Sequence, residues 1–182
     1  MVIPELETLR EVSTEAYDGL LDALALAEQA IRPELLEPIR RCVEGQLGNT
    51  EGDYYDPAWS PLQQAIAEFT DQFVFFVSGI TPEQRKPILD ALSTDELNEF
   101  MKVLYTVDMG YRIRLVHQSL LGEGGEGPLA PLPPRTPTAS DLDLTLKEIW
   151  RTATRLADTV VDDPETIEFL RLRHAWYHNC HT

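Results

Sequence analysis

The sequence predicts an all-α protein, and three observations support this prediction. Apolar residues recur at three- and four-residue spacing through Glu15–Ile31 and Leu97–Leu121, which is the pattern of amphipathic helices. Helix-start signatures precede the periodic segments, as in Thr81-Pro-Glu-Gln84. No segment shows the apolar/polar alternation of a half-buried strand, so we expect helices throughout.

Four expected helices come first along the chain, and each has a recognisable boundary. A proline suits the first helical turn, and a Gly-Asn pair suits a helix end. The expected helices are Glu15–Ile31, 33–47, 62–77 and one that begins after Thr81. Gly48-Asn49 ends the second of them, and residues 48–61 form a loop that contains aromatic residues.

The second half of the chain begins with a long helix from Ser93-Thr94 to Leu121. Residues 122–139 follow with four glycines and five prolines, which exclude a regular element and predict a partly extended linker. Ser140-Asp-Leu-Asp143 is expected to cap a further helix that reaches about Val161, and Asp163-Pro164 to open the last one.

The composition indicates a protein with one buried core. The chain has 182 residues, of which 43% are hydrophobic and 25% charged, so it is long enough for a domain of ordinary size. No run approaches the roughly 18 apolar residues of a membrane span. The first residues lack the basic and apolar regions of a signal peptide, so we expect a cytoplasmic protein.

The charge of the chain excludes two classes of partner. Thirty-one acidic against fifteen basic residues give a net charge of -16, whereas nucleic acids and anionic membrane surfaces need a basic footprint. We therefore expect an acidic, well-solvated surface. Two cysteines, Cys42 and Cys180, in a chain without an export signal do not form a disulfide framework, and Cys42 is expected to be a buried free thiol.

Two segments repeat a pattern at an offset of 131 residues. Residues 33–40 and 164–171 share Pro-Glu-x-x-Glu-x-x-Arg, and each follows an apolar helix. Helix-start chemistry alone also produces this pattern, since proline and early acids suit a first turn. The repeat hypothesis divides the chain into a first helical repeat at 1–121, a linker at 122–139, and the start of a second repeat at 140–182.

The residues with the most reactive side chains gather at the end of the sequence. Glu168, His174, His178, Cys180 and His181 lie within fourteen positions, so a thiol is surrounded by imidazoles and a carboxylate. In one straight helix Glu168 and Cys180 would be about 18 Å apart at ~1.5 Å per residue. A helix that ends near His178-Asn179 would bring them together, and neighbouring imidazoles would favour the thiolate.

The run Glu168-x-x-Arg171-Leu172-Arg173-x-Ala175-x-x-His178-Asn179-Cys180 resembles the beginning of the redox motif of the alkylhydroperoxidase D / carboxymuconolactone decarboxylase family. The resemblance implies an all-α, oligomeric fold with an internal repeat, in which Cys180 is one thiol of a Cys-x-x-Cys pair. It further implies that Glu168 accepts protons, with His181 or His178 as intermediary. The second cysteine would fall immediately after Thr182, so we expect the protein to continue beyond it or the site to have degenerated.

The resemblance implies a thiol oxidoreductase or peroxidase that forms a homo-oligomer, is regenerated by a thiol reductant protein, and has no cofactor. Two alternatives remain open: a helical interaction module that has lost the chemistry, and a carboxymuconolactone-decarboxylase-like enzyme. The spacing of His174 and His178, followed by Cys180 and His181, also suits zinc, but supporting carboxylates and a second ligand cluster are absent, so no metal is expected.

Overall fold

The computed structural model describes residues 3–48, 54–122, 124 and 128–160 as an assembly of helices, with no strand in these ranges. The predicted all-α class is therefore confirmed. The elements, in chain order, are η1 (Pro4–Leu6), α1 (Glu7–Val12), α2 (Thr14–Ala30), α3 (Pro33–Leu47), α4 (Pro61–Phe76), η2 (Val77–Gly79), α5 (Pro82–Ala91), α6 (Thr94–Leu121) and α7 (Leu142–Val160).

The helix starts follow the chemistry that the sequence predicts. At α5 the Thr81 hydroxyl accepts from the amide of Gln84, and the Gln84 side chain accepts from the amide of Thr81. Ser93 and Glu96 form the same reciprocal pair at α6. Each capping box satisfies two amides that the helix leaves unpaired, which fixes the boundary. The predicted boundaries of the helices from α2 to α7 are confirmed to within two residues.

The short helices η1 and α1 were not predicted, because this stretch is too short to show a clear helical period. Leu6 is nonetheless fully buried, and Ile3 is 3% exposed. The backbone amide of Ile3 donates to the hydroxyl oxygen of Tyr17 at 3.2 Å, which attaches this segment to α2. The first described residues therefore belong to the core.

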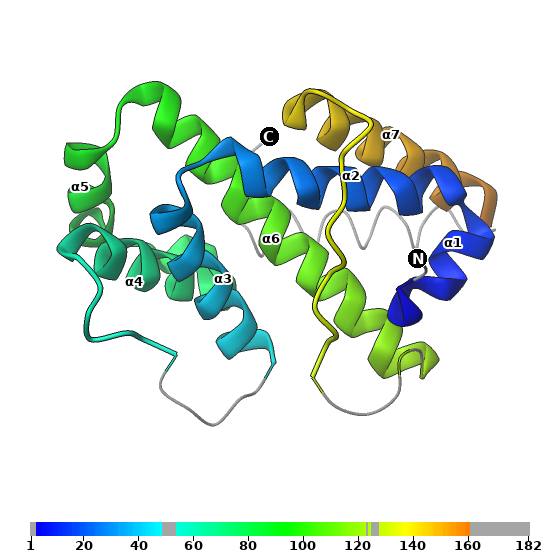
Figure 1. Ribbon diagram of the computed structural model, residues 1–182, viewed down its shortest axis with the longest axis horizontal. Helices are drawn as coiled ribbons and strands as arrows, with labels where there is room; N and C mark the ends of the chain where they lie inside the picture. The colour runs from blue at the N-terminus through cyan, green and yellow to red at the C-terminus, as the bar shows by residue number, and fades with distance from the viewer. Residues whose placement is uncertain (1–2, 49–53, 123, 125–127, 161–182) are drawn as a thin grey trace.

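Helix α6 runs diagonally through the molecule and contacts both α2 and α3 (Figure 1). It contributes Phe100, Val103 and Leu104, which are fully buried, to the main core. Near its middle, Gly110 allows α2 to approach closely, because a Cβ there would lie 2.7 Å from Cδ2 of Leu24. A larger residue at this position would displace the Leu24 side chain.

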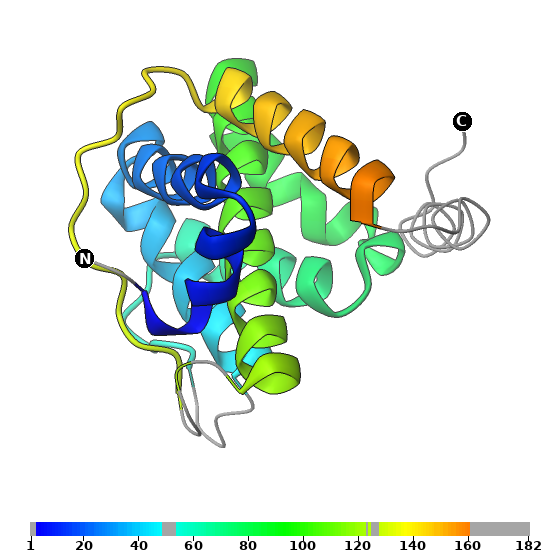
Figure 2. The same ribbon diagram turned by 90° about the vertical axis from the view of Figure 1, so that its right-hand side faces the viewer.

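Helix α7 packs against α2 (Figure 2). Its residues Leu146 and Ile149 pack against the main core. Arg155 donates to Glu15 at 2.6 Å, an additional contact between the two helices. The second copy of the Pro-Glu-x-x-Glu-x-x-Arg pattern, at 164–171, lies outside the described residues. The internal repeat and the division of the chain that it implies therefore stay predictions.

Residues 128–139, which we call the strap, connect the end of α6 to α7 without regular structure. The strap crosses the outer face of α2 (Figure 1, yellow). Its proline content explains the absence of a helix, as expected for the linker. Within the described ranges, no helix has the length and apolar character needed to cross a membrane.

Candidate functional site

All four residues to which a catalytic role was assigned, Cys180, Glu168, His181 and His178, lie outside the described residues. Their predicted roles therefore stay predictions. In the described part of the chain, no three His, Cys, Asp or Glu side chains are grouped so that they could hold a metal ion. Two other features of the described part bear on function: the surroundings of Cys42 and a pocket between α2, α3, α6 and the strap.

Cys42 is a free thiol with no exposed surface, as the sequence predicts. It lies in a small cluster with Trp59 and Ala67, against which Tyr54 and Tyr55 pack. Burial, reinforced by the negative charge of Asp71, raises the pKa of Cys42 to about 12. Because the thiolate is the nucleophile, Cys42 is unreactive at physiological pH.

We expect Cys42 to react with a disulfide reagent at least ~100-fold more slowly in the native protein than in denaturant, because both burial and the raised pKa remove the reactive thiolate. The measurement is the rate of release of the reagent's chromophore from a Cys180→Ser variant, with and without guanidinium chloride. Equal rates in the two conditions would contradict the buried position of Cys42.

The aromatic residues after α3 pack against the helices. The hydroxyls of Tyr54 and Tyr55 donate to Asp71 on α4, at 3.1 and 2.7 Å. Burial and the adjacent Asp71 carboxylate raise the pKa of Tyr54 to about 12 and that of Tyr55 still further. Both phenols therefore stay protonated and act as hydrogen-bond donors.

A pocket with a volume of about 530 Å³ opens between α2, α3, α6 and the strap. Small-molecule sites commonly measure about 300–1,000 Å³. Its lining combines charged, aromatic and apolar residues: Leu24, Glu28, Arg40, Arg41, Glu44, Gly45, Tyr54, Val107, Gly110, Tyr111, Arg114 and Pro128–Leu132. Tyr54 therefore contacts both the cluster around Cys42 and this pocket.

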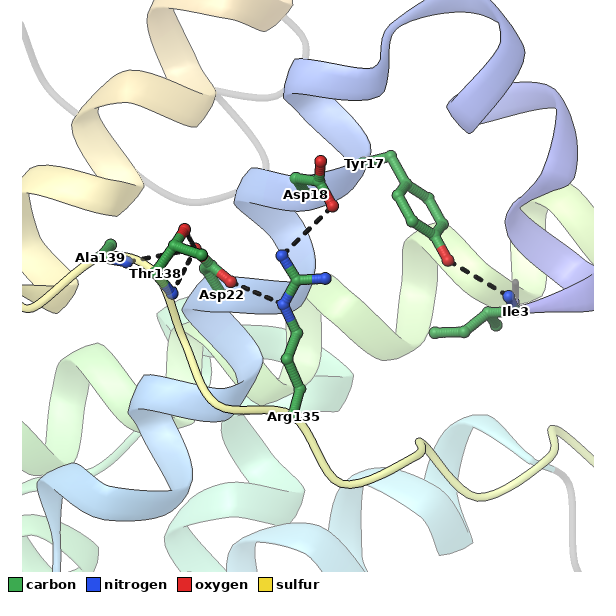
Figure 3. Close-up of polar contacts among 7 residues, drawn as sticks. All are labelled: Ile3, Tyr17, Asp18, Asp22, Arg135, Thr138 and Ala139. Atoms are coloured by element: carbon green, nitrogen blue, oxygen red, sulfur yellow. Dashed lines mark hydrogen bonds and ion pairs between the residues drawn. The ribbon is translucent and has the colours of Figure 1, made fainter. Parts of the chain in front are cut away.

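One end of the strap is attached to α2 by a buried carboxylate, Asp22 (Figure 3). Its side chain is 5% exposed and accepts from Arg135 Nε at 2.6 Å. It also accepts from the backbone amides of Thr138 and Ala139, at 3.0 and 3.2 Å, and from the Thr138 hydroxyl. Burial alone would raise the pKa of Asp22, but the hydrogen bonds from Thr138, Arg135 and Ala139 outweigh it and lower the pKa.

The strap is also attached near Ala130, by an arginine that forms a buried ion pair. Arg114 on α6 donates from Nε to Glu5 at 2.8 Å, and its Nη2 also donates to the carbonyl oxygen of Ala130. Both charged side chains are nearly inaccessible, with 7% of Arg114 and 2% of Glu5 exposed. The wall of the pocket that the strap forms is therefore held at Ala130 and again at Arg135–Ala139.

Sequence analysis assigned no role to Asp22, Arg114 or Glu5. One signal was present for Asp22, because an acidic residue between Leu21 and Ala23 interrupts the apolar face of a helix and must find a donor. Its partner, Arg135, is 113 residues away, and nothing in the sequence indicates that these two residues would pair.

Comparison with known proteins gives two relatives and no assigned activity. No family model matches the chain, and no solved structure matches it. Two proteins of Mycobacterium tuberculosis, from strains CDC 1551 / Oshkosh and H37Rv, are each 32% identical over 127 residues, and both are described only as uncharacterized. The match covers 66% of this chain and 42% of each relative, so the chain spans less than half of their length.

Proposed function

We propose that the chain is a thiol-dependent oxidoreductase that reduces hydroperoxides through Cys180. The observation that carries the proposal is the burial of Cys42. The sequence contains two cysteines, and Cys42 is inaccessible with a pKa raised to about 12. Any thiol chemistry of this chain therefore falls to Cys180.

The sequence around Cys180 supports the proposal, because it supplies the groups that thiol chemistry needs. His178 and His181 flank the cysteine, and Glu168 precedes it by twelve residues, as in the alkylhydroperoxidase D-like motif. A neighbouring imidazolium favours the thiolate, and a carboxylate with an imidazole can pass protons to a leaving group. The all-α class of the described residues agrees with this resemblance, although a shared fold class does not determine activity.

The proposed reaction begins when the Cys180 thiolate forms a bond to one oxygen of a hydroperoxide. The O–O bond breaks, and the departing alkoxide takes a proton that Glu168 passes on through His181 or His178. Cys180 becomes a sulfenic acid, and the substrate leaves as an alcohol. A first thiol of the reductant condenses with the sulfenic acid, releasing water and forming a mixed disulfide. A second thiol then releases Cys180 as a thiol, and the reductant leaves as a disulfide.

The test is consumption of tert-butyl hydroperoxide in the presence of dithiothreitol. We expect Cys180→Ser to reduce the rate to that of the reductant alone, because the nucleophile is lost. Glu168→Gln should lower the rate by about 10²-fold, because general acid–base catalysis contributes at this level. The matched control is Cys42→Ala, which removes the other thiol and should leave the rate unchanged.

Equal rates for the unmodified chain and Cys180→Ser would overturn the proposal. That result would leave the non-enzymatic helical module and the decarboxylase-like enzyme as the remaining hypotheses. Loss of activity in Cys42→Ala with retained helical content would equally contradict the assignment of the chemistry to Cys180.

A further inference from the structure

Three arginines line the pocket beside the strap, and together with their partners and Glu44 they form a group of three cations and five carboxylates. Arg40 is paired with Glu28, and Arg114 with Glu5. Arg41 lies 3.2 Å from Asp56 and 3.7 Å from Glu37. These three arginines therefore contact four carboxylates, of which Glu28 also lines the pocket, and Glu44 is the second carboxylate of the lining. In the described part of the chain Glu44 has no ion-pair partner, so an uncompensated negative charge faces the pocket.

The end of α3 increases this negative potential. Glu44 and Gly45 belong to the last turn of α3, which carries no basic side chain. The carbonyl groups of the last helical turn carry a partial negative charge, equivalent to about half an electron for a whole helix. A cation placed beside Glu44 would therefore interact favourably with both the carboxylate and the helix terminus.

Two tyrosines supply aromatic surface at the same place. The Tyr54 ring covers Gly45 so closely that a methyl group there would overlap it, and Tyr111 of α6 lies beside Gly48 at the end of α3. Burial and the charge of Glu44 raise the pKa of Tyr111, against the opposite influence of Arg114, so this phenol is neutral. The face of a neutral aromatic ring attracts an ammonium group.

The remaining wall of the pocket is apolar. Leu24 and Val107 form it on the helical side, and the strap adds Pro128–Leu132. A purely hydrophilic cation would gain nothing from this surface, whereas an alkyl or aryl group would bury apolar area against it.

We propose that this pocket binds a small organic ammonium ion, with its charged group beside Glu44 and the two tyrosines and its apolar body against Leu24, Val107 and the strap. The proposal rests on the described residues alone and is independent of any chemistry at Cys180. We expect an anionic ligand of the same size to bind more weakly, because the three arginines of the lining are already paired with carboxylates.

The experiment is an isothermal titration of the full chain with hexylammonium at low ionic strength, alongside hexanol and hexanoate. We expect one saturable site for hexylammonium, at least tenfold tighter than for hexanol, and no binding of hexanoate. Equal affinities for hexylammonium and hexanol would overturn the proposal, because the charge would then contribute nothing. Failure of hexylammonium to saturate a single site would overturn it as well.

Two variants of equal net charge separate the pocket from general attraction to an acidic chain. Glu44→Gln should weaken hexylammonium binding about fivefold, because one adjacent carboxylate is lost. Glu11→Gln removes an exposed carboxylate on α1, away from the pocket lining, and should change affinity less than twofold. The same loss in both variants would show that only the overall charge matters and would overturn the proposed site.

A third variant tests the aromatic contribution. Tyr111→Phe keeps the ring and should retain affinity, whereas Tyr111→Leu removes the π-system and should weaken binding about threefold. Equal affinities for these two variants would contradict a contact between the ammonium group and this ring.

Discussion

Arg114→Met is expected to lower the free energy of unfolding by about 3–5 kcal/mol, because it leaves the buried carboxylate of Glu5 without its partner. The Glu5 side chain is 2% exposed, so water cannot replace the guanidinium. The carbonyl of Ala130 in the strap loses a donor as well. Denaturation by urea, followed by circular dichroism at 222 nm, measures the change.

The second half of this experiment separates the net value of the ion pair from the cost of breaking it. In the double variant Glu5→Leu/Arg114→Met neither charge remains, so more than half of the lost stability should return. Arg151→Met is the control, since Arg151 is 75% exposed and, among the residues that the structure describes, pairs with Glu148 in its own helix alone; its effect should stay below about 0.5 kcal/mol. A loss below about 1 kcal/mol for Arg114→Met would contradict the buried pair.

Local sequence signals predicted most of the helical structure. The capping boxes at Thr81–Gln84 and Ser93–Glu96 fix two helix starts through contacts only three residues apart, which a sequence shows directly. The burial of Cys42 was also predictable, because an unpartnered cysteine on a helix with an apolar face is usually buried.

Long-range pairing was not predictable. Glu5 reads as an acid in a first helical turn, a position that complements the helix dipole, yet it pairs with Arg114, 109 residues away. The proline-rich composition of 128–139 indicates an extended segment but not that it would cross α2 and form a pocket wall. The same limit applies to Glu44, because the sequence does not indicate that the described side chains of α6 and the strap would leave it without an ion-pair partner among them. The predicted site at Glu168 and Cys180 lies outside the described residues.

Asp22→Asn is expected to lower the free energy of unfolding by about 3 kcal/mol and to release the strap from α2. The carboxylate accepts hydrogen bonds from Arg135, Thr138 and Ala139, and an amide cannot accept all of them while its own NH₂ group needs acceptors. Urea denaturation measures the loss. Limited proteolysis by trypsin at Arg135 measures the release, because a protease needs an extended, accessible segment.

The pH dependence of this effect has a definite sign. The folded-state pKa of Asp22 is lowered from the ordinary 3.8, so its stabilising contribution is fully present above that value and is lost as the pH falls through the lower folded-state pKa. The difference in stability between the unmodified chain and Asp22→Asn should therefore be constant near neutrality and shrink in acid. Asp18→Asn is the control, because Asp18 is 49% exposed and its one ion pair within the described ranges is with Arg135, at 3.2 Å. If both variants lost the same stability, Arg135 and not the buried carboxylate would hold the strap.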